Sequence, residues 1–221
     1  MTRRAMHLTA AEATAVDAQI AAVEARTGTQ VVVAVIGKAD AYVELPWMAF
    51  ALGASLAAFA LVIAEAWRPD WATGHAALRV TVTILAAGSA SALAAVFLPA
   101  FARLFLRPSR RDVEVRQYAQ ALFLERELFR TRERNAVLLL VSLFERKIEL
   151  LPDTGFGNRV AAADWHRVVT RMAPLLRERR PADALREGLD ALADALTRNG
   201  FRPAGAGDDQ LPNRPIEERG A

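Results

Sequence analysis

Two long apolar stretches in the first half of the chain limit its possible folds more than any other feature. No charged side chain occurs from Trp47 to Ala64, and none occurs from Val80 to Ala102. A helix rises about 1.5 Å per residue, so each stretch can cross a hydrocarbon core of about 30 Å. We therefore predict a transmembrane helical hairpin over residues 47–102, with the lipid bilayer as its surroundings.

The flanks of this hairpin predict its orientation. Only Arg68 and Arg79 lie in or near the loop between the stretches, together with Glu65 and Asp70. Basic residues crowd instead before the first stretch and after the second: Arg3, Arg4, Lys38, Arg103, Arg107, Arg110, Arg111 and Arg116. Because positive charge favours the cytoplasmic side, we predict a two-span membrane protein with both termini in the cytoplasm. Trp47, Trp67 and Trp71 would then lie near the membrane interfaces.

The polar segment before the hairpin predicts one helix and one strand. Thr9 and Glu12 have the spacing of a capping box, so a helix is expected from about Ala10 to Arg26, ended by Gly28. The β-branched run within Gln30–Ile36 is typical of a strand that is covered on both faces. One strand alone leaves its backbone unpaired, so its partners must follow the hairpin.

The segment after the hairpin supplies those partners. We expect a helix over 110–131, a buried strand over 136–141, a half-solvated hairpin strand over 147–151, a helix over 161–172 with a kink or restart at Pro174, and a helix over 181–199. The first strand should pair with 136–141. This order predicts an α/β domain in two parts, 8–43 and 110–200, interrupted by the hairpin at 47–102 and followed by an extended tail over 201–221.

Composition excludes several kinds of chemistry. The chain has no cysteine, which removes disulfides and thiol catalysis, and its three histidines, His7, His75 and His166, are far apart in the sequence. Its 28 basic residues are mixed with 25 acidic ones, so no basic stripe predicts a nucleic acid partner. Phosphate-binding glycine loops and a Gly-x-Ser-x-Gly nucleophile motif are also absent from the sequence.

Polar residues near the expected strand ends form the candidate site: Ser142, Glu145, Arg146, Asp153 and Asp164. If they share the carboxyl-terminal edge of the sheet, Asp153, Asp164 and Glu145 would supply oxygen ligands for a divalent cation such as calcium or magnesium. The alternative is structural: Glu145 and Arg146 in a solvated turn, Asp153 in an Asx turn, and Asp164 facing a helix dipole. Arg134 and Arg146 are the candidates for binding a phosphate or an acidic partner, although the charges at 130–134 are also typical of a solvated helix end.

A family resemblance follows from the order of these motifs. Asn135–Ser142 reads Asn-Ala-Val-Leu-Leu-Leu-Val-Ser and is followed by Glu145-Arg146-Lys147, as in the TPM domain family, also called TPM phosphatase, which includes chloroplast photosystem-repair proteins. The chain is most similar to bacterial membrane members with two spans inserted after the first strand, through its Thr131–Arg134 run and its 211–217 tail. The resemblance implies a three-layer α/β/α sandwich with a small mixed sheet, and Asp153 and Asp164 as cation-binding positions. Phosphatase activity is implied by the family's name alone, and the glycine-rich loop of many secreted members is reduced here to residues 154–157.

Two functions remain open at this point. The first is a membrane-tethered interaction module for the assembly or quality control of other membrane proteins. The second is a metal-assisted phosphomonoester hydrolase that uses Asp153, Asp164 and Glu145 as ligands, with Arg134 or Arg146 holding the phosphate.

Overall fold

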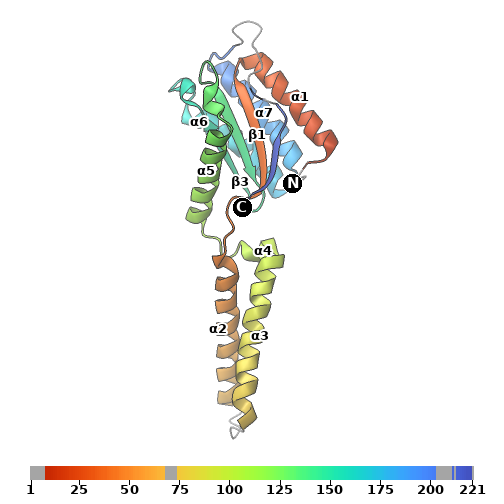
Figure 1. Cartoon of the computed structure of the whole chain (residues 1–221), viewed down its shortest axis with the longest axis vertical. Helices are drawn as coiled ribbons and strands as arrows, with labels where there is room; N and C mark the ends of the chain where they lie inside the picture. Colours follow the sequence, from red (N-terminus) through yellow and green to blue (C-terminus); the bar gives the residue numbers. More distant parts are fainter. Residues whose placement is uncertain (1–7, 68–73, 203–210, 212, 221) are drawn as a thin grey trace. The chain divides into compact units, whose positions relative to one another are not determined.

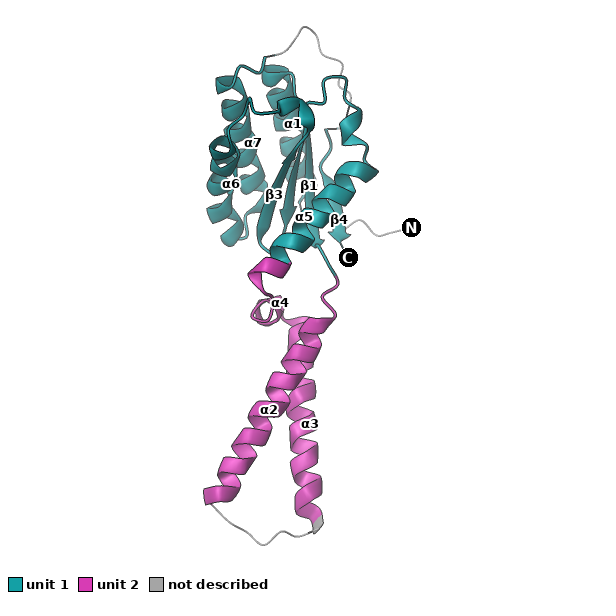
Figure 2. Ribbon diagram, turned by 90° about the vertical axis from the view of Figure 1, so that its left-hand side faces the viewer, with its two compact units in different colours: residues 1–40, 111–221 teal, residues 41–110 magenta. Residues whose placement is uncertain are grey.

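The structure is a computed structural model that describes residues 8–67, 74–202, 211 and 213–220. Trp71 and the rest of the loop at 68–73 lie outside the described residues, as do residues 203–210, 212 and 221 of the expected tail. The chain divides into two compact units (Figure 2): residues 1–40 with 111–221, here called the sheet unit, and residues 41–110, here called the hairpin unit.

The sheet unit is built on four strands, in the order β3-β2-β1-β4. They are β1 (Gln30–Lys38), β2 (Ala136–Ser142), β3 (Lys147–Pro152) and β4 (Ile216–Gly220). β1 is parallel to β2 and β4, whereas β2 and β3 are antiparallel. Val31 pairs with Val137 and Val35 with Val141, so the predicted pairing of the two apolar runs is confirmed.

Helices cover both faces of this sheet (Figure 1). One face packs on α1 (Ala10–Thr27), α6 (Ala162–Arg177) and α7 (Pro181–Arg198), and the other on α5 (Pro108–Glu125). Along β1, Val31, Val33 and Val35 belong to the first core, while Val32 and Ile36 belong to the second. Since side chains alternate across a strand, a continuous apolar run is required, and the predicted three-layer α/β/α fold is confirmed.

The helix ends follow the expected local chemistry at α1 and differ at α6. The Thr9 hydroxyl accepts from the Glu12 amide while the Glu12 carboxylate accepts from the Thr9 amide, and Gly28 ends α1 in a left-handed conformation with φ of 67°. The restart expected at Pro174 is wrong, because α6 continues to Arg177. The proline removes only the hydrogen bond to the carbonyl four residues earlier, at the exposed Thr170, where water can take its place.

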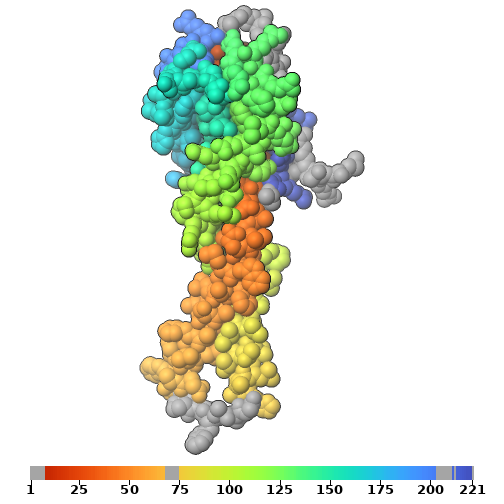
Figure 3. All heavy atoms as spheres, turned by 60° about the vertical axis from the view of Figure 1, so that its left-hand side comes forward, coloured from red at the N-terminus to blue at the C-terminus, as the bar shows by residue number. Residues whose placement is uncertain are grey.

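The hairpin unit consists mainly of α2 (Glu44–Trp67) and α3 (Gly74–Phe97), followed by the short α4 (Pro99–Ala102). The second apolar stretch was expected to continue to Ala102, but α3 ends before Pro99, which cannot donate a backbone hydrogen bond within a helix. Both α2 and α3 are long and apolar enough to cross a membrane. Figure 3 shows the atoms of α2 in orange and those of α3 in yellow. Among the apolar side chains of α2, Trp47 is 73% and Phe59 65% exposed.

The expected tail contains a strand. Residues Ile216–Gly220 form β4 at the sheet edge, with Ala34 opposite Ile216 and Lys38 opposite Gly220. Polar contacts also hold this segment: the Leu8 amide donates to the Glu217 carboxylate at 3.1 Å, and the Leu211 amide donates to the Gln30 side chain at 3.0 Å. Leu211 and the strand at Ile216–Gly220 are therefore part of the domain.

Candidate functional site

The residues predicted to share one edge of the sheet lie at its two opposite ends. Glu145 follows the end of β2, whereas Asp153 follows β3, which runs back antiparallel, and the Asp153 amide donates to the Ala136 carbonyl at the start of β2. Seven residues of β2 separate these ends, roughly 20 Å at about 3.3 Å per residue. Arg134 precedes β2 and Arg146 follows it, so these two arginines are separated in the same way.

Glu145 ties together the ends of β1 and β2. Its side chain is buried, with one oxygen accepting from the Ala39 amide at 2.9 Å and the other accepting from the Ser142 hydroxyl. Ala39 directly follows β1, and Ser142 is the last residue of β2. Both carboxylate oxygens are thus engaged in closing the loops at this end, which is a structural role. Arg146, in the same turn, is exposed and has a positive φ of 51°.

At the other end of the sheet, Asp153 forms a two-point ion pair with Arg134. Nε of Arg134 donates to one oxygen at 2.8 Å and Nη2 to the other at 2.9 Å, and the Thr154 amide donates to Asp153 at 2.7 Å. The carboxylate is 2% exposed. The hydrogen bonds to Asp153 raise the pKa of Arg134. The Thr154 contact is the Asx-type turn that formed the structural alternative for this aspartate.

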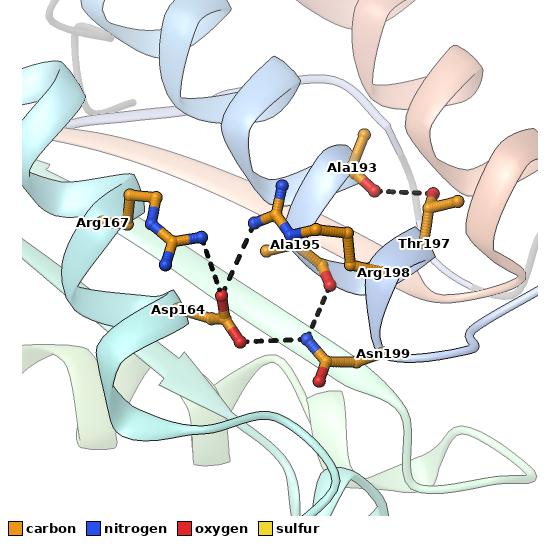
Figure 4. A network of polar contacts seen from close by, with 7 residues as sticks. All are labelled: Asp164, Arg167, Ala193, Ala195, Thr197, Arg198 and Asn199. Carbon is orange, nitrogen blue, oxygen red and sulfur yellow. Dashed lines mark hydrogen bonds and ion pairs between the residues drawn. The ribbon is translucent and has the colours of Figure 1, made fainter.

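Asp164 lies in the first turn of α6 and reaches the end of α7 (Figure 4). One of its oxygens accepts from the Asn199 side-chain amide at 3.1 Å. The other faces two guanidinium groups, Arg167 at 3.0 Å and Arg198 at 3.5 Å. The Asn199 hydrogen bond, and then the two arginines, hold the pKa of Asp164 below its usual range.

The structure does not bring the three predicted cation ligands together. Among the described residues, no group of three or more histidine, aspartate and glutamate side chains is placed to hold a metal ion. The physical reason is that β3 reverses direction between Glu145 and Asp153. Asp153 and Asp164, which lie toward the same end, are turned to different arginines.

One further feature of this end was not predicted from the sequence. The guanidinium of Arg159 lies 3.9 Å from the ring centroid of Phe201, and Phe156 packs against Phe201 at 5.1 Å and against Trp165 at 5.6 Å. Arg159 stands in a loop rich in glycine and asparagine, where no motif marks it. We call this end of the sheet unit, with Arg134, Arg159, Arg167 and Arg198 against Asp153 and Asp164, the arginine end. These six side chains, four guanidinium groups and two carboxylates, together carry a formal charge of +2.

Comparisons with known proteins agree with this architecture. The family model described as TPM domain matches residues 85–195. No curated protein matches the chain. The NMR structure of the BA42 protein from the psychrophilic bacterium Bizionia argentinensis is similar over 96% of this chain and 94% of its own, with a TM-score of 0.56 and 15% sequence identity. At that identity the likeness shows a shared fold.

Proposed function

The chain belongs to the TPM domain family, and we propose that it is a membrane-tethered member whose sheet unit is a cytoplasmic interaction module for other membrane proteins. Assembly or quality control of those proteins is the role that we assign to it. The proposal has two parts, the membrane anchor and the interaction.

The exposure of α2 and α3 supports the anchor. Both helices are long enough to span a bilayer. In an apolar stretch of 18 residues, only 6% of the residues of α2 and 11% of those of α3 are buried inside the structure. A core helix of a soluble protein buries its apolar side chains, and large exposed apolar surfaces in water favour aggregation. A bilayer would cover Trp47, Phe59 and Leu78, each more than half exposed.

The positive-inside rule supports the orientation. Arginines follow α3 at positions 103, 107, 110, 111 and 116, while the loop between the helices and its flanks hold only Arg68 and Arg79, together with Glu65 and Asp70. This distribution favours the cytoplasmic side for both halves of the sheet unit. The proposed location is the cytoplasmic membrane of a bacterium, with two spans.

The arrangement of the carboxylates favours an interaction module over hydrolysis. A metal-assisted phosphomonoesterase using Asp153, Asp164 and Glu145 needs these groups to converge on one cation. Each of them instead bonds to its own partner: Arg134, the Arg167–Arg198 pair, and Ser142 with the Ala39 amide. These contacts stabilise the domain and leave its surface to bind other molecules.

The anchor can be tested by expressing the full chain in bacteria and separating membranes from the soluble fraction. We expect it in the membrane pellet after alkaline carbonate extraction. Reporter fusions after Ala221 and within the 68–73 loop should report opposite sides, with Ala221 cytoplasmic. A carbonate-soluble chain, or a periplasmic reporter at Ala221, would overturn this part of the proposal.

The interaction can be tested by photo-crosslinking from the surface of the sheet unit in intact membranes. A stoichiometric membrane-protein partner is expected. In parallel, p-nitrophenyl phosphate hydrolysis is measured with and without magnesium or calcium. Hydrolysis by the purified chain that is lost in both Asp153→Ala and Asp164→Ala would favour the hydrolase instead.

A further inference from the structure

Among the described residues, the carboxylates that contact the arginine end are fewer than its guanidinium groups. From this excess we infer that the arginine end is the docking surface for an acidic segment of a partner protein, with Arg159 as its anchor. This inference rests on the proposed interaction function and specifies the chemistry of the partner.

Arg159 is held in place by aromatic packing. Its side chain is exposed, and within the described residues its guanidinium contacts the Phe201 ring and no carboxylate. Phe201 is 6% exposed, and Phe156, which packs against it, is 1% exposed. A guanidinium that rests on a fixed ring keeps its N–H groups directed outward in its own plane, so it can form a two-point contact with a carboxylate at little entropic cost.

Arg167 and Arg198 share a single carboxylate. Both contact the same oxygen of Asp164, and their side chains are 56% and 51% exposed. Asn199 holds the other oxygen, and it also donates to the Ala195 carbonyl at 2.8 Å, which fixes the aspartate against the end of α7. One negative charge therefore serves two positive charges, and the second is available to an anion from outside.

These two groups of side chains adjoin each other. Trp165 follows Asp164 in α6, Phe201 follows Asn199 by two residues, and both rings pack on Phe156. The aromatic cluster thus joins the stacked Arg159 to the Arg167–Arg198 pair, whose convergence on Asp164 is visible in Figure 4.

The chemistry favours a protein segment over nucleic acid or a single phosphate. Nucleic-acid sites of this kind present exposed rings on which bases stack, whereas Phe156 and Phe201 are buried. The three guanidinium groups come from separate segments: the loop after β3, α6 and the end of α7. Successive carboxylates along an acidic peptide can engage all three, and each such charge-assisted pair adds affinity and fixes register.

The test uses the full chain in nanodiscs of phosphatidylcholine, which carries no net charge. The probe is a fluorescein-labelled peptide of ten glutamates, and binding is followed by fluorescence anisotropy. We expect Arg159→Gln to weaken peptide binding roughly tenfold. The double variant Arg167→Gln with Arg198→Gln should weaken it by a similar factor. The matched control is Arg177→Gln in the last turn of α6, an exposed arginine away from the arginine end, which should bind like wild type.

Arg159→Lys tests whether positive charge alone is sufficient or the planar guanidinium stacked on Phe201 is required. It keeps the positive charge but loses the planar donors, so its binding should fall between that of wild type and that of Arg159→Gln. Thermal melts of each variant, expected to match wild type, show that a loss of binding is not a loss of fold.

Equal binding by wild type, Arg159→Gln and the double variant would overturn the inference. So would competition by a ten-nucleotide RNA or by inorganic phosphate that matches the glutamate peptide at equal charge concentration. Failure here leaves the membrane anchor standing, because carbonate extraction tests it separately. A carbonate-soluble chain that still binds the peptide would overturn the anchor and not this surface.

Discussion

Arg134 and Asp153 are joined by two parallel hydrogen bonds, 2.8 and 2.9 Å long, across the loops that flank the start of β2 and the end of β3. The pair closes the β2–β3 hairpin at the arginine end. The Asp153 carboxylate is buried, and the Arg134 guanidinium is about half exposed. Because of this exposure, the pair is weaker than a fully buried one and stronger than an ion pair in open solvent.

The first prediction concerns this pair. Asp153→Ala leaves the Thr154 amide without its side-chain acceptor and Arg134 without its counter-charge, so we expect a loss of about 1–3 kcal/mol in the free energy of unfolding. The measurement is a denaturation curve of the full chain in detergent, followed by circular dichroism. The control is Arg177→Ala, which should unfold like wild type. If Asp153→Ala is as stable as this control, the pair does not hold the hairpin.

The second prediction concerns how the edge strand is held. The Tyr118 hydroxyl, on α5, donates to the Glu218 carboxylate at 2.7 Å, and Arg126 reaches the other Glu218 oxygen at 2.9 Å. Burial, and then the hydrogen bond and negative charge of Glu218, raise the pKa of Tyr118 well above its usual range. Replacing the carboxylate by an amide removes a charge that opposes the phenolate, so Glu218→Gln should lower the pKa of Tyr118.

This shift can be measured by phenolate absorbance in a Tyr42→Phe background, which leaves Tyr118 as the single tyrosine. Glu217→Gln is the matched control, because it makes the same change at the neighbouring position of β4, where the carboxylate bonds to the Leu8 amide. An unchanged pKa of Tyr118 in Glu218→Gln would show that β4 does not lie against α5 as described.

The third prediction compares two aspartates with pKa shifts of opposite sign. Burial raises the pKa of Asp17 above 3.8, with Arg214 opposing the shift, and one of its oxygens is buried with no hydrogen-bond partner within the described residues. A raised pKa means that the folded state binds the proton more tightly. Ionised Asp17 therefore lowers the stability of the folded state as pH rises from 3.8 through the raised pKa. Asp17→Asn should be more stable than wild type above this pH window and as stable as wild type below it.

Asp164 should behave in the opposite way. Its pKa is lowered from 3.8, so it contributes stability above that value and loses it as pH falls through the lowered one. Asp164→Asn should therefore be less stable than wild type at neutral pH, and the difference should shrink in acid. Melting temperatures of both variants are measured from pH 3 to pH 8. The acidic part of this pH range is where carboxylates titrate. Parallel pH profiles for the two variants would contradict the opposite shifts.

Local sequence patterns were enough to predict the central strands β1 and β2 but not the edge strand β4. The runs in β1 and β2 are apolar on both faces, so each needs a covered, paired environment and together they specify a parallel pair. β4 reads Ile-Glu-Glu-Arg-Gly, with one apolar side chain, and it is a strand because the edge of β1 accepts it. Its fit is close: a Cβ on Gly220 would lie 1.6 Å from the Lys38 carbonyl oxygen. Such complementarity depends on the folded partner, which lies far away in the sequence.

The three carboxylates predicted to share one edge of the sheet lie apart because β3 is antiparallel to β2. The motif order predicted β3 as a hairpin partner of β2, and an antiparallel partner carries the residue after it back to the start of β2. Asp153 thus lies far from Glu145 for the same reason that the hairpin forms. Arg159 could not be recognised, since its role depends on Phe201, which follows α7 and reaches it only through tertiary packing.

The last prediction concerns the contact between α2 and α3, where Gly53 and Gly88 let the two helices approach closely. A Cβ on Gly53 would lie 2.1 Å from the Ser91 hydroxyl oxygen and 2.8 Å from the Ala87 carbonyl oxygen. Gly53→Val should therefore push the helices apart and cost roughly 1–3 kcal/mol by overpacking. The mole fraction of SDS that unfolds the chain measures this loss. Ala60→Val, on an exposed position of α2, is the control, and equal unfolding of the two variants would contradict the close packing at Gly53.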